Sequence, residues 1–133
     1  MKTTLLLLVT LTVVACASGY NPRYYYNNIE VANLTGAEIR NVEVQVGVSG
    51  RNLRCDSVSN NALCQVRFGK RPYPEAEGVS LSWEDAEGNA QAIQLNPSVP
   101  ITMQVSVAVR LMMDIAEDGS VRAYFKQETL FAS

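Results

Sequence analysis

Hydrophobic side chains recur at every second position along most of this chain. The clearest example is Val42, Val44, Val46 and Val48, which alternate with polar residues or glycine. Such alternation predicts a strand with one buried face, and β-branched side chains favour strands. The windows that share this period are 29–33, 42–48, 53–55, 64–68, 79–84, 90–95, 101–113 and 121–126. Seven or eight short strands without a helical window predict an all-β fold. We expect an antiparallel immunoglobulin-like β-sandwich, with a small closed β-barrel as the alternative.

Two segments differ from the other windows in length or in proline content. The window 101–113 is the longest, and it exceeds the usual strand length of about 5–6 residues, so we expect a bend, a bulge or a strand shared by two sheets. The segment 69–78 contains Pro72 and Pro74 and is expected to be the longest irregular loop.

The first residues have a different composition. Lys2 and Arg23 enclose a stretch without charge, and residues 5–9 are LLLLV. A basic start followed by a short apolar run is typical of a secretory signal peptide. The run is too short for a membrane span, which needs ~20 apolar residues.

The end of this stretch, Val13-Val14-Ala15-Cys16, resembles the lipobox of bacterial lipoprotein precursors. In that class the cysteine sulfur is joined to a diacylglyceryl group, the signal is cut before the cysteine, and the new amino terminus is acylated. The resemblance implies a signal peptide in 1–15, a lipidated Cys16 with a tether in 16–27, and a folded domain in 28–133.

Two further consequences depend on the residues around Cys16. In the lipoprotein class an Asp directly after the cysteine retains the protein in the inner membrane, and this chain has Ala17, which implies the periplasmic face of the outer membrane. The alternative is that Ala15-Cys16-Ala17 is an ordinary A-x-A cleavage site. Cleavage after Ala17 would discard Cys16 and release a soluble periplasmic protein.

Tyrosines crowd the tether, at Tyr20, Tyr24, Tyr25 and Tyr26. They can form a belt at the membrane interface, where Tyr is favoured. They can also pack on the domain and fix the direction of the tether, which is the interpretation we favour.

Composition excludes several function classes. The chain has 133 residues, a formal net charge of −2 and no histidine. A mildly acidic chain without a basic stripe argues against nucleic-acid binding and gives no electrostatic attraction to anionic lipid, so we expect the acyl group alone to hold the protein. The absence of His removes the commonest general base and metal ligand. No cofactor, metal or small-molecule substrate is expected.

Besides Cys16, the cysteines are Cys55 and Cys64, and in an exported chain such a pair predicts a disulfide. The eight residues between them suit a cross-strand bridge within a hairpin. Trp83 and this pair resemble features of immunoglobulin domains, but the spacing is too short for the inter-sheet bridge of that fold. The mature domain therefore resembles small immunoglobulin-like envelope lipoproteins in architecture only.

Two surface features are candidate sites. Carboxylates gather in two predicted turns, Glu84-Asp85-x-Glu87 and Glu117-Asp118. They can hold Ca²⁺ or transfer protons, but Asp also simply forms turns, which we favour. The segment with Lys70, Arg71 and Tyr73 is a candidate partner contact, against the alternative of a plain crossover with solvated charges.

These features lead to a hypothesis about function. Without His, nucleophilic catalysis is left with Ser–Lys arrangements, and no motif of that kind is present. We expect a non-enzymatic, lipid-anchored binding or accessory module for an envelope protein. The alternative is a periplasmic inhibitor of an attacking enzyme such as lysozyme, by analogy with other small bridged lipoproteins.

Overall fold

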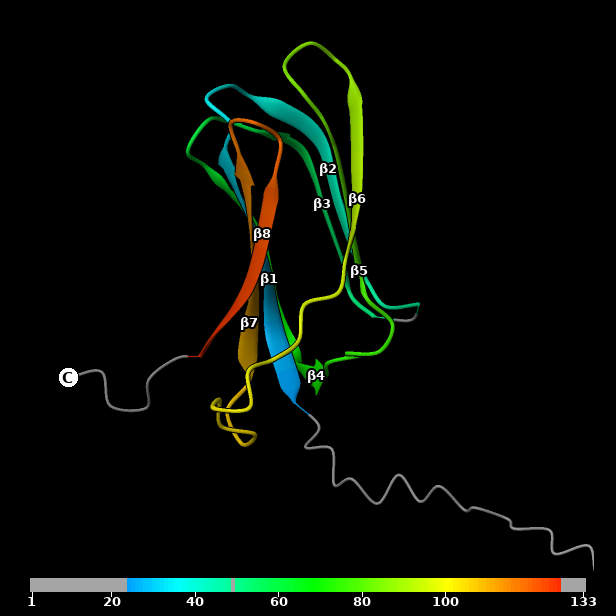
Figure 1. The fold of residues 1–133 in the computed structure, drawn as a ribbon, viewed down its shortest axis with the longest axis vertical. Helices are drawn as coiled ribbons and strands as arrows, with labels where there is room; N and C mark the ends of the chain where they lie inside the picture. The colour runs from blue at the N-terminus through cyan, green and yellow to red at the C-terminus, as the bar shows by residue number, and fades with distance from the viewer. Residues whose placement is uncertain (1–23, 49, 128–133) are drawn as a thin grey trace, which may run out of the picture.

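The computed structural model describes residues 24–48 and 50–127, which form a β-sandwich (Figure 1). Its strands are β1 (Tyr25–Leu34), β2 (Ile39–Val46), β3 (Asn52–Val58), β4 (Leu63–Pro72), β5 (Val79–Glu84), β6 (Ala90–Leu95), β7 (Val109–Ala116) and β8 (Val121–Gln127). Sheet A has the order β4-β1-β7-β8, and sheet B has the order β3-β2-β5-β6. The two sheets stay separate, so the sandwich prediction is confirmed and the closed barrel is wrong.

Strand direction departs from the prediction in one place. β1 and β7 are parallel neighbours in the middle of sheet A, with Ile29 opposite Leu111. Every other pair is antiparallel. The pair is parallel because segment 96–108 crosses from sheet B to sheet A at the end of the sandwich where β1 begins, so that β1 and β7 both start at that end.

The core lies between the sheets and is built by the predicted alternation. Val42, Val44 and Val46 of β2 are fully buried, and they face residues such as Ile29 and Leu111 of sheet A across the sandwich. Val48 was expected on the same face but is 82% exposed. β2 ends at Val46, since Gly47 adopts φ 66° and turns the chain.

The predicted strand 101–113 is wrong over its first half. Segment 96–108 leaves β6 at the edge of sheet B and reaches the middle of sheet A. Two turns interrupt it, in which Met103 N donates to Pro100 O (3.0 Å) and Val107 N donates to Gln104 O (3.3 Å). Ile101 is consequently 91% exposed. Apolar and polar residues alternate in this segment, although the segment belongs to neither sheet.

The predicted loop 69–78 is also partly wrong, because β4 continues to Pro72. Tyr25 pairs with Pro72 and Tyr26 pairs with Arg71. Pro72 fits because β4 is an edge strand, where one side of the backbone needs no ladder partner.

The disulfide between Cys55 and Cys64 is confirmed, with a Cα–Cα distance of 6.2 Å, but the hairpin around it is wrong. β3 pairs with β2 and β4 pairs with β1, so the bridge joins the two sheets. The short connection between β3 and β4 crosses from one sheet to the other along the same side of the sandwich. An inter-sheet bridge is therefore possible at a sequence separation of 9.

The chain enters the sandwich earlier than residue 28. β1 begins at Tyr25, and Tyr24 and Tyr26 are buried, which confirms for these two that the tyrosines pack on the domain. Tyr24 Oη donates to Pro100 O and Met103 O, at 3.2 Å each, and so holds segment 96–108 against the start of β1. Tyr20, Cys16 and the predicted signal peptide lie outside the described residues.

The sandwich has two distinct ends (Figure 1). At the end where β1 begins, which we call the tether end after the predicted tether, residues 47–48 and 50–51 and the connections 73–78 and 96–108 are found. At the distal end, the connections 35–38, 59–62, 85–89 and 117–120 turn the chain. The two ends lie a full strand length apart.

Candidate functional site

Three connections at the distal end surround a pocket of about 280 Å³. Buried Ile39 and Trp83 contribute its apolar wall, while Glu87, Glu117 and Asp118 are exposed. The residues around it are Thr35, Ala37, Ile39, Trp83, Asp85, Ala86, Glu87, Gln91, Ala116, Glu117, Asp118 and Gly119. The two acidic turns, separate in sequence, thus border one pocket. Sequence reasoning missed this because the two hairpins belong to different sheets.

Two of these carboxylates form the turns in which they lie. Asp85 Oδ1 accepts from Asn89 N (2.8 Å) and Glu87 N (3.0 Å). Its hydrogen bonds, led by the one from the backbone of Asn89, lower the pKa of Asp85 below the ordinary value. Asp118 Oδ1 accepts from Ser120 Oγ (2.6 Å) and Ser120 N (2.9 Å), and these bonds lower its pKa as well. Both stay ionised at neutral pH.

A calcium loop at 85–89 is not supported by this geometry, because backbone N–H groups occupy the Asp85 oxygen that would face the ion. Within residues 24–48 and 50–127, no group of three or more His, Cys, Asp or Glu side chains is arranged to hold a metal ion.

Glu87 and Glu117 differ from the two aspartates because their carboxylates are exposed and do not build the turns. Trp83 lines the same pocket and is 4% exposed, so negative charge borders a largely buried aromatic residue. This combination suits an organic cation such as an ammonium or guanidinium group, which gains from both.

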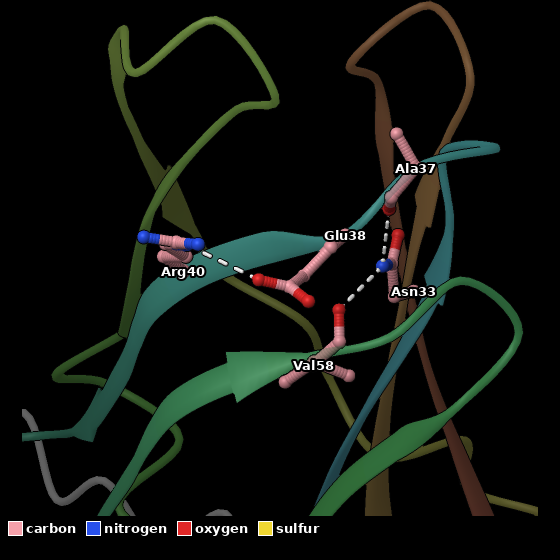
Figure 2. A network of polar contacts seen from close by, with 5 residues as sticks. All are labelled: Asn33, Ala37, Glu38, Arg40 and Val58. Carbon is pink, nitrogen blue, oxygen red and sulfur yellow. Dashed lines mark hydrogen bonds and ion pairs between the residues drawn. The ribbon is translucent and has the colours of Figure 1, made fainter.

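The outer flank of the connection 85–89 has a second hollow of about 480 Å³, lined by Glu38, Arg40, Glu84, Asp85, Ala86, Glu87 and Gly88. Here Arg40 Nε donates to Glu38 Oε1 at 3.1 Å, and both side chains are exposed (Figure 2). The pair is neutral by itself, and Glu84, Asp85 and Glu87 leave this flank negative as well.

Asn33 is the polar centre that fixes the distal connections (Figure 2). It is fully buried at the end of β1. Its Nδ2 donates to Ala37 O (2.7 Å) and Val58 O (2.9 Å), and its Oδ1 accepts from Thr35 Oγ1 (2.7 Å). One side chain therefore joins sheet A to the end of β3 in sheet B. The sequence pattern placed Asn33 on the buried face but did not reveal this role.

The predicted contact group Lys70, Arg71 and Tyr73 is divided by the structure. Lys70 and Arg71 are exposed on β4, whereas Tyr73 is only 6% exposed. The Tyr73 ring packs edge-on against Tyr26 and Phe125, and its Oη donates to Pro97 O at 3.0 Å. Tyr73 is a core residue and cannot serve as a surface contact, while the role of Lys70 and Arg71 stays a prediction.

The chain matches no protein-family model and no curated protein. Among solved structures, it is similar to the NMR structure of a protein from Eubacterium rectale, with a TM-score of 0.49 and 12% identity over 79% of this chain and 92% of that one. None of the described segments is a helix long and apolar enough to span a bilayer.

Proposed function

We propose that this protein is a lipid-anchored, non-enzymatic binding module on the periplasmic face of the outer membrane. The distal pocket would receive a cationic group of an envelope protein. The observation that carries the proposal is the position of this pocket, at the opposite end of the sandwich from the start of β1.

The distance between the two ends supports this arrangement. β1 has 10 residues, so the pocket lies ~30 Å from the point where the tether joins the domain. A lipid on Cys16 would attach the domain at its tether end and leave the distal pocket, a strand length from the attachment point, open to the periplasm. Several acyl chains bind a bilayer firmly, whereas one chain binds only marginally.

The pocket supports the class of partner. Glu87, Glu117 and Asp118 are exposed, hydrogen bonds lower the pKa of Asp85 and Asp118, and the apolar wall includes Trp83. A Lys or Arg side chain on a partner surface would insert its charged end among the carboxylates and lay its stem along the apolar wall.

Trp83 provides the test, because it is the chain's one tryptophan and it lines the pocket. A short peptide with one Arg should change its fluorescence in a saturable way, and the citrulline analogue should not. The variant Glu87→Gln/Glu117→Gln should lose the response. The matched control Glu43→Gln/Asp56→Asn, which removes two exposed carboxylates from sheet B, should keep it. Equal responses to Arg and citrulline would refute the cationic partner.

Anchoring is tested separately by mass spectrometry of the mature amino terminus. A product that begins with acylated Cys16 is expected. A product that begins at Ser18 without lipid would refute the anchor.

Inhibition of an attacking enzyme is a second candidate, because an acidic distal end also suits a basic hydrolase. Muramidase assays at increasing protein concentration separate the two. Inhibition that is lost in Glu87→Gln/Glu117→Gln would favour the inhibitor.

A further inference from the structure

Charge is divided unevenly between the two sheets. The strands of sheet A carry six of the nine Lys and Arg residues in the described parts of the chain, and only two of the twelve carboxylates. Sheet B and the connections carry the rest. The formal net charge of −2 therefore conceals a basic layer beside an acidic one.

Five of these six basic residues, all but Arg71, lie on the outer face of sheet A, and four of them stand in rows set by the strand register. One row is Arg67, Asn28, Arg110 and Lys126. The next rows are Gln65, Glu30, Met112, Tyr124 and then Leu63, Ala32, Asp114, Arg122. Each row of four spans ~14 Å at the usual strand spacing. We call these twelve residues, together with Tyr25 and Lys70, the outer face of sheet A.

The two carboxylates of this face are engaged by its own residues. Glu30 is 5% exposed, and its Oε1 lies 3.8 Å from Arg110 Nη2. Asp114 stands opposite Arg122 and accepts a long hydrogen bond from Tyr124 Oη (3.5 Å). Arg67, Arg122, Lys126 and Lys70 are exposed and add positive charge that the two acids do not balance.

Aromatic and apolar groups accompany these charges. Arg122 and Lys126 both lie over the ring of Tyr124, at 4.8 and 5.7 Å from its centroid. Lys70 lies 5.3 Å from the centroid of Tyr25, and Leu63 is 56% exposed. Tyr rings flanked by Lys and Arg are the composition favoured at a membrane surface.

The tether joins the domain at this layer. β1 lies in the middle of sheet A, and Tyr25 follows Cys16 by only nine positions. Nine extended residues reach ~30 Å at most. A lipid on Cys16 would hold sheet A within reach of the leaflet, and this covalent proximity favours lipid over a soluble anionic polymer as the occupant.

We infer that the outer face of sheet A rests on an anionic lipid surface, so that the domain lies against the leaflet with sheet B and the distal pocket exposed to the periplasm. This inference rests on the proposed lipid anchor. It names the bilayer as a second partner of the domain, distinct from the partner of the pocket.

The positions of the lysines allow a test on the native protein. After removal of the signal peptide the lysines are Lys70 and Lys126, and both lie on the outer face of sheet A. The lipidated protein is purified from cells and placed in detergent, in phosphatidylcholine vesicles, or in vesicles that also contain phosphatidylglycerol. Both lysines are acetylated with a water-soluble reagent and quantified by mass spectrometry.

Phosphatidylglycerol should slow acetylation of both lysines several-fold relative to neutral vesicles. Carboxylate labelling at Glu87 and Glu117 should not change. In the variant Arg67→Gln/Arg122→Gln the affinity of this face for phosphatidylglycerol vesicles should fall about fivefold for each charge removed, so that most of the protection is lost. The control Arg40→Gln/Arg54→Gln removes two exposed arginines of sheet B and should leave the protection unchanged.

Equal acetylation in neutral and anionic vesicles would overturn the inference, and so would protection by a soluble anionic polysaccharide in place of the vesicles. If mass spectrometry finds no lipid on Cys16, the anchor fails, and co-sedimentation of the unlipidated protein with phosphatidylglycerol vesicles becomes the deciding measurement. Co-sedimentation that Arg67→Gln/Arg122→Gln reduces would support the face without the anchor. Absence of co-sedimentation would overturn it.

Discussion

The two ends of the sandwich are closed by different kinds of interaction. At the tether end four aromatic rings, Tyr26, Phe68, Tyr73 and Phe125, meet edge-on with centroids 5.0–5.6 Å apart. At the distal end the connections are fixed by the amide of Asn33, by turn-forming aspartates and by the nearby disulfide. Packing of rings fills space, whereas hydrogen bonds and a covalent bridge fix loops and leave space between them. The pocket is found at the end closed in the second way.

The largest effect is expected from Tyr26→Ala, which breaks the tether end. Tyr26 is 1% exposed, contacts two rings and accepts a hydrogen bond from Arg51 N (3.2 Å). Its truncation should lower the free energy of unfolding by about 3–5 kcal/mol, since it leaves a cavity among rings that cannot collapse. Chemical denaturation measures this. A loss below that of the other variants described here would mean that packing does not dominate this end.

Removal of the disulfide should come next. Cys55→Ser/Cys64→Ser should cost about 2.5–3 kcal/mol on the chain-entropy estimate, because the closed loop is short. The same loss should follow reduction of the native protein. A variant as stable as the oxidised protein would show that the bridge adds nothing to the inter-sheet contact.

Asn33→Ala should destabilise the protein by about 1–3 kcal/mol, because Val58 O and Ala37 O lose a buried donor. Asn28→Ala is the matched control. Asn28 is equally buried, but its Oδ1 has no hydrogen-bond partner, so its removal should cost less. Equal losses would contradict the role assigned to the Asn33 amide.

The smallest effect is expected from Tyr73→Phe, about 1 kcal/mol at neutral pH for the bond to Pro97 O. This difference in stability should shrink at alkaline pH. Burial, with a smaller contribution from Glu75, raises the pKa of Tyr73 well above its ordinary value. The unfolded chain releases this proton near pH ~10 and the folded chain does not, so stability falls as pH rises beyond ~10. Unfolding midpoints between neutral and alkaline pH should converge for wild type and Tyr73→Phe, and parallel curves would contradict this.

Strands that pair with their neighbours in sequence were predictable. β5 and β6 match their predicted limits, because Val79, Leu81 and Trp83 alternate strictly and a glycine-containing turn follows. The same local rule failed for Cys55 and Cys64, since a turn-rich connection can join two sheets as well as two strands of one sheet. Sequence spacing alone does not distinguish these cases.

Alternation also misled where no partner strand is available. Ile101, Met103, Val105 and Val107 alternate as regularly as the residues of β7, but they lie in the crossover between sheets. The candidate site is likewise predictable only in parts, because local patterns do not show which segments meet in the fold. Each acidic turn was visible in the sequence, but the pocket depends on which hairpins meet at the distal end.

The parallel pairing of β1 with β7 has a mechanical consequence. A pull on the proposed lipid tether would act along β1, and its neighbours β4 and β7 hold it through ladders on both sides. The force would load those hydrogen bonds together in shear, whereas a strand peeled from an edge opens them one at a time. The strand that would connect the domain to the membrane is thus the one best placed in sheet A to bear tension.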